Sequence, residues 1–203
     1  MKPEHEVTIV LLAGGKATRL PGKLTRTIGD EPMIVRVYRQ LTGTGRPCIV
    51  SVREPLPAAI AQHISALTVE DAHGDVGPLG ALASAATHVR TPLLFAAAGD
   101  LPNVDSGVVD ELEEVYRRET QRSGVAPDVV LPRHANGDVE PLAALYNTVA
   151  LRTSAVRALA QGRNKVTRAL EGLRVTYYDI AAGEAAKFVN VNTADDLAGI
   201  QPA

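Results

Sequence analysis

The sequence predicts a three-layer, Rossmann-like α/β fold in which a mostly parallel sheet is covered by helices on both faces. Short apolar runs, each about as long as a buried strand, alternate with longer helical patterns. This β-α-β-α order is typical of a parallel sheet, because each helix returns the chain to the edge where the next strand begins. The first apolar run also enters a pair of glycines directly, as strands do at the ligand-binding edge of an open α/β sheet.

The expected elements follow one another along the chain in a simple order. Strands are predicted at residues 7–12, 48–52, 67–69, 93–97 and 129–131, and helices at 33–41, 58–64, 79–88 and 104–118. The last third is predicted to extend the sheet and to wall one side of a cleft. Its expected strands are 142–146, 175–180 and 188–191, and its expected helices are 149–159, 165–170 and 195–200.

Length and composition exclude several classes of protein. A chain of 203 residues suits one domain with one substantial core. With a net charge of −2 and only 3% aromatic residues, it lacks the basic and stacking surfaces that bind nucleic acids. Cys48 is the only cysteine, which excludes an internal disulfide and a cysteine-rich metal site. The apolar run at 7–13 is too short for a membrane span, so we expect a cytoplasmic protein.

The segment after the first predicted strand carries the features of a phosphate-binding loop. Glycines let the backbone approach a phosphate closely and point N–H groups at it. An arginine can clamp phosphate oxygens, and a lysine adds a mobile charge. A plain turn with two solvated basic residues is the alternative, since the motifs of P-loops and dinucleotide-binding loops are absent. The candidate residues are Leu12, Ala13, Gly14, Gly15, Arg19 and Lys23.

A carboxylate stands at the mouth of the strand predicted at 93–97, in the sequence Gly99-Asp100-Leu101-Pro102. A carboxylate at such a place is costly without a partner. Mg²⁺ prefers one or two carboxylates together with phosphate oxygens and water. Asp100 is therefore predicted to bind Mg²⁺. The alternative is a turn or capping aspartate, although Asp105 is already a candidate N-cap for the following helix.

The glycine-rich segment resembles the loop of the MobA-like nucleotidyltransferases, usually Leu-Ala-Gly-Gly-x-Ser-x-Arg-Met-Gly-x-x-Lys. The match covers residues 12–15, Arg19 and Lys23, whereas Ala17 replaces the usual serine and Pro21-Gly22 makes the loop one residue shorter. The family also carries Gly-Asp-x-Pro, in which the aspartate binds Mg²⁺. The resemblance thus implies the fold of the nucleotide-diphospho-sugar transferases and strengthens the assignment of Asp100.

The resemblance also implies a nucleotide pocket. In the family, an aspartate shortly before Gly-Pro-Leu lies in the guanine nucleotide pocket, and here Asp71 precedes Gly77-Pro78-Leu79. A Gly-Pro entry presents free N–H groups at a helix N-terminus, although an ordinary proline-started helix has the same sequence. The family commonly has an asparagine after the second strand, and Ser51 takes this place. Ser51, Asp71 and Gly77 are therefore assigned to the nucleotide.

Two later motifs point to the acceptor. Glu140-Pro141-Leu142 resembles the Glu-Pro-Leu segment that the family has near its acceptor. Asn190 and Asn192 alternate, so both would face one side of the short predicted strand. Thr193 is a candidate cap for the next helix, with Asp196 three residues further on. The Asn-x-Asn-Thr tail is characteristic of molybdenum cofactor guanylyltransferases, whereas related cytidylyltransferases tend to carry aspartates there.

The resemblance extends from residue 7 to residue 200 and implies one domain, with a nucleotide-binding part at about 1–125 and an acceptor-binding part at about 126–203. The implied reaction moves GMP from GTP to molybdenum–molybdopterin, with Mg²⁺ as cofactor and Arg19, Lys23 and Asp100 as catalytic residues. The resemblance also implies molybdoenzymes or pterin-delivery proteins as further partners. A sibling transferase for another base or phosphorylated acceptor is one alternative, and a non-catalytic GTP-binding carrier is another.

Overall fold

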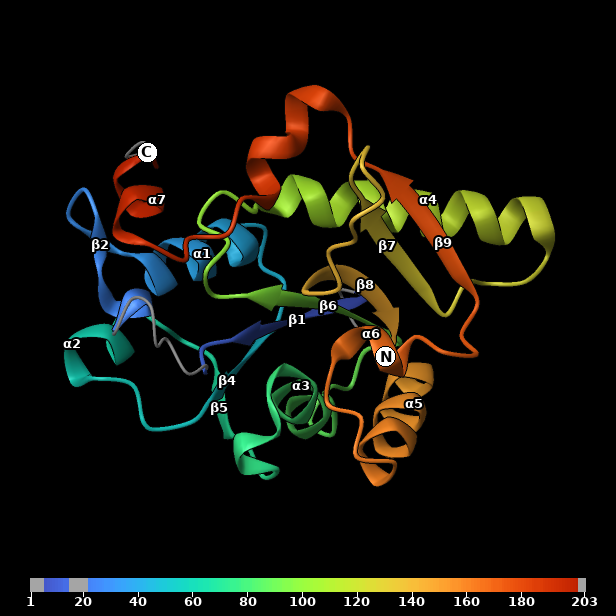
Figure 1. Ribbon diagram of the computed structural model, residues 1–203, viewed down its shortest axis with the longest axis horizontal. Coiled ribbons are helices and arrows are strands. Elements are labelled where there is room, and N and C mark those ends of the chain that lie inside the picture. Colours follow the sequence, from blue (N-terminus) through green and yellow to red (C-terminus); the bar gives the residue numbers. More distant parts are fainter. Residues whose placement is uncertain (1–5, 15–21, 201–203) are drawn as a thin grey trace.

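The computed structural model describes residues 6–14 and 22–200, and its main sheet has seven strands. The order along the sheet is β5-β4-β1-β6-β8-β7-β9 (Figure 1). These strands are β1 (Val7–Leu12), β4 (Cys48–Val52), β5 (Leu67–Glu70), β6 (Leu93–Ala98), β7 (Val129–Arg133), β8 (Ala143–Asn147) and β9 (Val175–Asp179). A separate two-stranded ribbon joins β2 (Thr27–Ile28) to β3 (Glu31–Pro32).

The predicted mostly parallel sheet is confirmed. Strands β5, β4, β1 and β6 are parallel neighbours, and β9 is parallel to β7. In the main sheet, β8 is antiparallel to both its neighbours, β6 and β7. The last third of the chain therefore extends the sheet through β8 and β9, as its apolar runs predict.

Helices cover both faces of the sheet. In Figure 1, α4 (Ser106–Ser123) lies above the sheet, and α3 (Pro78–Ala86) and α5 (Thr148–Ala160) lie below it. None of the described helices is both long and apolar enough to cross a membrane. The remaining helices are α1 (Met33–Thr42), α2 (Ala58–Ala61), α6 (Val166–Ala169), α7 (Ala194–Ala198) and the short 3-10 helices η1 (Lys23–Thr25), η2 (Gly74–Val76) and η3 (Ala182–Phe188).

Strand β1 runs through the middle of the core. Ile9 and Leu11 pack in a cluster with α1 and α4, whereas Val10 and Leu12 pack in a second cluster with α3 and α5. Successive side chains of a strand point to opposite faces, so a strand between two helical layers is mostly apolar on both faces. This explains why residues 7–12 are apolar apart from Thr8, whose buried hydroxyl is hydrogen-bonded to the Thr91 hydroxyl at 2.7 Å.

Two helix caps predicted from the sequence are confirmed. The Asp105 carboxylate accepts a hydrogen bond of 3.1 Å from the backbone N–H of Val108 at the start of α4. Thr193 and Asp196 form a reciprocal capping box at the start of α7. Both caps satisfy N–H groups that have no partner within the helix, and they set where each helix begins.

The strand predicted at 188–191 is wrong. The segment follows η3 and forms no strand in the structure; the Val191 N–H donates to the Asp100 carbonyl at 2.9 Å. In a strand, residues 189 and 191 would lie on the same face and be buried to a similar extent. Instead, Val191 is fully buried while Val189 is 45% exposed. Asn190 and Asn192 therefore do not share the face of a strand. The short apolar pattern reflects Phe188 and Val191 anchoring an irregular segment to the core.

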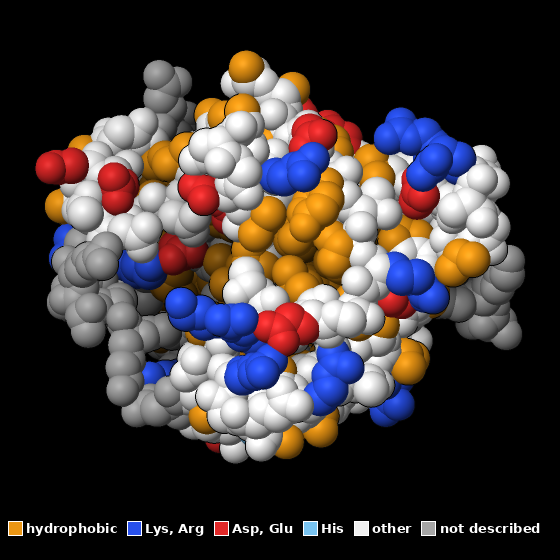
Figure 2. Space-filling view, turned by 45° about the vertical axis from the view of Figure 1, so that its right-hand side comes forward, with side chains coloured by type: hydrophobic (Ala, Val, Ile, Leu, Met, Phe, Trp, Pro, Cys, Tyr) orange, Lys and Arg blue, Asp and Glu red, His pale blue; other side chains and the backbone are white. Residues whose placement is uncertain are grey.

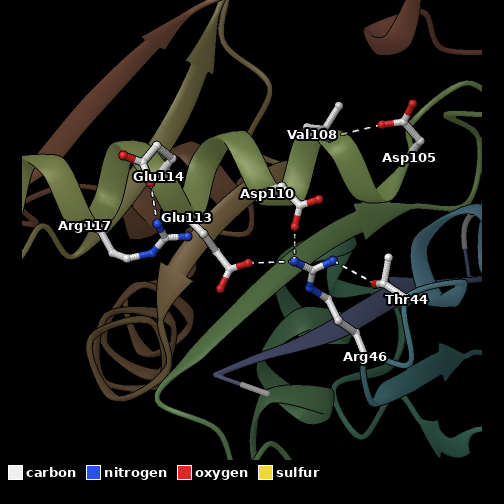
Figure 3. Close-up of polar contacts among 8 residues, drawn as sticks. All are labelled: Thr44, Arg46, Asp105, Val108, Asp110, Glu113, Glu114 and Arg117. Atoms are coloured by element: carbon white, nitrogen blue, oxygen red, sulfur yellow. Dashed lines mark hydrogen bonds and ion pairs between the residues drawn. The ribbon is translucent and has the colours of Figure 1, made fainter. Parts of the chain in front are cut away.

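An ion cluster fixes α4 against the loop before β4 (Figure 3). The Arg46 guanidinium pairs with Asp110, and with Glu113 at 2.7 Å, and it donates to the Thr44 hydroxyl at 3.0 Å. The Arg46 side chain is only 8% exposed. Its burial works to lower the pKa, but the hydrogen bonds to the two carboxylates outweigh burial and raise it. Arg46 is thus a buried cation whose charge is compensated from α4.

We expect Arg46→Ala to lower the free energy of unfolding by about 2 kcal/mol, because it leaves the half-buried Glu113 without its cation. Urea denaturation followed by circular dichroism measures this change. Arg117→Ala is the matched control, since Arg117 and Glu114 are exposed neighbours on α4 and such pairs contribute less than about 1 kcal/mol (Figure 3). Equal effects of the two substitutions would contradict a special role for Arg46.

Candidate active site

The predicted phosphate loop and Asp100 meet where the direction of strand addition reverses. From β1 the sheet grows one way to β4 and β5 and the other way to β6. Ends of adjacent parallel strands open a crevice at such a point, which is where open α/β sheets bind ligands. Leu12 lies beside Ala98 in register, and the Gly99 N–H donates to the Leu12 carbonyl at 3.0 Å. The loop after β1 and the turn after β6 therefore start side by side.

A cavity of about 580 Å³ opens at this point. Most of its wall is apolar, and charged side chains come from the loop after β1, the turn after β6 and the segment after β4. Such a mixture of apolar walls and a few convergent polar groups is typical of small-molecule sites. The residues that line it include Leu12, Ala13, Gly14, Lys23, Arg53, Glu54, Ala98, Gly99, Asp100 and Leu142.

Lys23 joins three segments that are far apart in sequence. Its ammonium forms an ion pair with Asp100 and lies 3.4 Å from both the Val191 carbonyl and the Asn192 side-chain oxygen. Only 16% of the Lys23 side chain and 20% of the Asp100 side chain are exposed. The structure thus brings Lys23, Asp100 and Asn192 together as a polar cluster at the cavity.

The Asp100 carboxylate could supply one oxygen ligand to a hard divalent cation. Within residues 6–14 and 22–200, no group of three or more His, Cys, Asp or Glu side chains could hold an ion by itself. A single carboxylate at the cavity leaves the other coordination positions to ligand oxygens and water. Mg²⁺ is commonly bound in this way, by one or two carboxylates and substrate phosphates.

Glu140 has a partner that the sequence did not suggest. Its carboxylate lies 3.0 Å from the His134 Nε2 atom, across the hairpin that joins β7 to β8. Burial raises the pKa of the Glu140 carboxyl, although the hydrogen bond with His134 opposes this rise. The His134 ring packs edge-on against Phe188, with ring centroids 6.2 Å apart. His134 thus connects Glu140 to the segment that leads to Asn190 and Asn192.

The other predicted nucleotide residues lie in different surroundings. The Ser51 side chain is 1% exposed, donates to the Ala81 carbonyl of α3 at 3.3 Å and does not reach the cavity. The Asp71 carboxylate accepts from the His73 N–H at 2.9 Å and from the Ser84 hydroxyl at 3.2 Å, and so stabilises the turn before α3. Gly77 lines a second cavity. Gly15 and Arg19 lie outside the described residues.

Two charged residues of the cavity wall are not among the site residues predicted from the sequence. Arg53 and Glu54 follow β4 directly and line the cavity. The rule that ligands bind beyond the carboxyl ends of parallel strands would have selected them. The resemblance points to Ser51 instead, but Ser51 lies within β4 and faces α3. Cys48, also in β4, is excluded as a nucleophile because burial raises the pKa of its thiol to about 12.

Comparison with known proteins gives consistent results. A model of the MobA-like NTP transferase domain matches residues 9–175. A molybdenum cofactor guanylyltransferase of Burkholderia vietnamiensis is 28% identical to this chain, covering 96% of it and 95% of the relative. A probable molybdenum cofactor guanylyltransferase of Haloferax mediterranei is 27% identical, covering 93% and 90%.

Solved structures share the same architecture. Molybdopterin-guanine dinucleotide biosynthesis protein A of Archaeoglobus fulgidus superimposes with a TM-score of 0.75 and 26% identity, covering 94% of this chain and 95% of that one. The 2-C-methyl-D-erythritol 4-phosphate cytidylyltransferase of Thermus thermophilus superimposes with a TM-score of 0.66 over 96% of both chains. At 15% identity, the latter likeness concerns the fold alone.

We expect Gly99→Ala to destabilise the fold, because a Cβ atom at residue 99 would lie 2.9 Å from Ile34 Cδ1 and 3.0 Å from the Leu12 carbonyl oxygen. The free energy of unfolding in urea should fall by about 1–3 kcal/mol, as for other overpacked sites. Gly183→Ala is the control, since a Cβ atom there meets nothing within 4 Å. An unchanged stability of Gly99→Ala would refute the close approach of the two strand ends.

Proposed function

The chain belongs to the MobA-like NTP transferase family, and we propose that it transfers GMP from GTP to molybdenum–molybdopterin with release of pyrophosphate. The observation that carries this proposal is the meeting of Lys23 and Asp100 in a cavity at the ends of β1 and β6. The name of the Burkholderia vietnamiensis relative, which aligns with 96% of this chain, supports the choice of nucleotide and acceptor.

The proposed reaction is a direct in-line displacement. An oxygen of the acceptor's terminal phosphate attacks the α-phosphorus of GTP, a new P–O bond forms, and the bond to pyrophosphate breaks. The protein needs to supply positioning and charge neutralisation rather than a covalent intermediate. Gly14 and Gly15 would place backbone N–H groups at the phosphates, and Lys23 and Arg19 would neutralise their charge.

Asp100 is the residue that would hold Mg²⁺. The ion would withdraw charge from the nucleotide phosphates when bound. Lys23 would then move its ammonium from the Asp100 carboxylate to the phosphate oxygens, which are the stronger source of negative charge beside it. The Lys23–Asp100 pair thus keeps both groups compensated until the nucleotide arrives.

Each of the two parts of the domain would bind one of the two substrates. Within residues 1–125, Asp71 and Gly77 are proposed to border the nucleotide. Within residues 126–203, Glu140, Asn190 and Asn192 are proposed to contact the acceptor. Because Asn192 already lies beside Lys23, the acceptor side and the phosphate side adjoin at the reacting atoms. Proteins that deliver the pterin or receive the product are further proposed partners.

The proposed substrates predict which nucleotide releases pyrophosphate. The purified protein should release it with Mg²⁺, molybdenum–molybdopterin and GTP, and not when CTP, ATP or UTP replaces GTP. A coupled pyrophosphate assay measures this directly. Release with CTP instead would retain the transferase reaction but overturn the base. Tight GTP binding with no release would indicate a different acceptor or a non-catalytic carrier.

Asp100→Asn should lower the turnover number at least about 100-fold, because an amide is a poor ligand for Mg²⁺ and cannot replace the carboxylate charge. Its circular dichroism spectrum and urea midpoint should stay close to those of the wild type. Asp30→Asn, at an exposed turn between β2 and β3, is the control and should retain full activity. Near-normal turnover of Asp100→Asn would remove Asp100 from the metal site.

A further inference from the structure

The turn that carries Asp100 is held from the side of α1 by a buried arginine. Arg36 is only 6% exposed, and its Nε atom donates to the Pro102 carbonyl at 2.9 Å. Its Nη2 atom donates to the Asn103 side-chain oxygen at 3.4 Å. A buried guanidinium is costly unless its N–H groups meet acceptors, so the turn and α1 stabilise each other. The backbone after Asp100 therefore has a fixed place against α1.

Asn103 joins this turn to η3. Its Nδ2 atom donates to the Ala186 carbonyl at 3.2 Å, between residues 83 positions apart in the sequence. The oxygen of the same side chain accepts from Arg36. An arginine has donors and no acceptor, so it selects the oxygen end of the amide and leaves the NH2 end for η3. Arg36 thus orients the group that holds η3.

A second hydrogen bond joins the same two segments. The Val191 N–H donates to the Asp100 carbonyl at 2.9 Å, and the buried Val191 side chain packs in a cluster with Ile28 and Met33. The 186–192 segment is therefore attached to the turn at two points, one near each of its ends. In Figure 1 it belongs to the red stretch that leads to α7.

The attached segment carries groups of the candidate active site. The Lys23 ammonium lies 3.4 Å from both the Val191 carbonyl and the Asn192 side-chain oxygen, and it pairs with Asp100. Figure 2 shows a face of the molecule on which charged side chains stand around a hollow of hydrophobic ones. Charged and polar groups at an open hollow keep their distances only if the backbone segments that carry them are fixed. Transfer between two bound substrates is sensitive to displacements of about 1 Å.

We propose that Asn103 is a positioning residue that fixes the 186–192 segment to the Asp100 turn. It thereby sets the distance between Asn192, on the acceptor side, and Asp100, on the metal side. This inference rests on the proposed function. Asn103 is not one of the described residues that line the two cavities, so it acts through η3 and touches no substrate. Helix α4 does not need Asn103 as a cap, because Asp105 has that role.

Steady-state kinetics of Asn103→Asp test this role. The carboxylate keeps an oxygen for Arg36 but has no N–H to donate to the Ala186 carbonyl. The KM for molybdenum–molybdopterin should rise on the order of 10-fold, as expected for one lost hydrogen bond, and the KM for GTP should stay within 2-fold. A merely structural role would lower kcat through the folded fraction and leave both KM values unchanged. That result would overturn the inference, as would wild-type kinetics.

A double-mutant cycle tests whether Asn103 acts through Asn192. If it does, Asn103→Asp should raise the KM for the acceptor much less in an Asn192→Ala background than in the wild type, because the contact that it positions is already absent. Fully additive effects would contradict the inference. Gln62→Glu is the matched control, since it makes the same chemical change at an exposed amide that donates to the Ala59 carbonyl at 3.1 Å. It should leave both KM values unchanged.

Amide hydrogen exchange separates this inference from the proposed function. If the wild type releases no pyrophosphate with any nucleotide, the proposed function fails, and exchange followed by mass spectrometry still tests the attachment. In Asn103→Asp the amides of residues 187–192 should exchange on the order of 10-fold faster than in the wild type, whereas those of β6 should not change. Unchanged exchange at 187–192, or faster exchange throughout the chain, would refute the positioning role.

Discussion

The contact between Lys23 and Asp100 is the interaction on which the site depends. It links the end of the loop after β1 to the turn after β6, and Lys23 also reaches the Val191 carbonyl and Asn192. Two partly buried charges of opposite sign compensate each other, so neither is left alone at the mouth of a buried strand. The same two charges complement phosphate oxygens and a cation. The charges that compensate each other in the fold are thus the ones that we propose meet the nucleotide and Mg²⁺.

The sheet makes this contact possible. Strand β1 is buried on both faces and lies between β4 and β6, so its end is fixed by the packing of both helical layers. The hydrogen bond from the Gly99 N–H to the Leu12 carbonyl holds the two strand ends together, and a Cβ atom at residue 99 would lie only 3.0 Å from that carbonyl oxygen. Beyond this point, Pro78 and Leu142 divide the surface into two adjoining cavities. Rigid strand ends thus position the groups that a transfer between two phosphates requires.

Much of the fold could be predicted from the sequence, because local patterns report burial. Apolar runs located β1, β4, β6 and β7, and the caps at Asp105 and Thr193 depend on residues only three positions apart. Motif chemistry likewise selects Lys23 and Asp100, although no sequence pattern shows that the two side chains meet. The strand expected at 188–191 failed because two buried anchors, Phe188 and Val191, imitate a short apolar run. Local patterns do not reveal whether a partner strand is present.

The sequence by itself determined the fold class, the order of the elements and the chemical character of the loop after β1 and the turn after β6. Only the tertiary structure decided which polar side chains share a cavity, because that depends on contacts between residues far apart in the chain. It turned Ser51 toward α3, paired Glu140 with His134, and placed Lys165 and Pro78 in the wall of one cavity. Strand register and helix packing set these directions, and neither can be read from a short stretch of sequence.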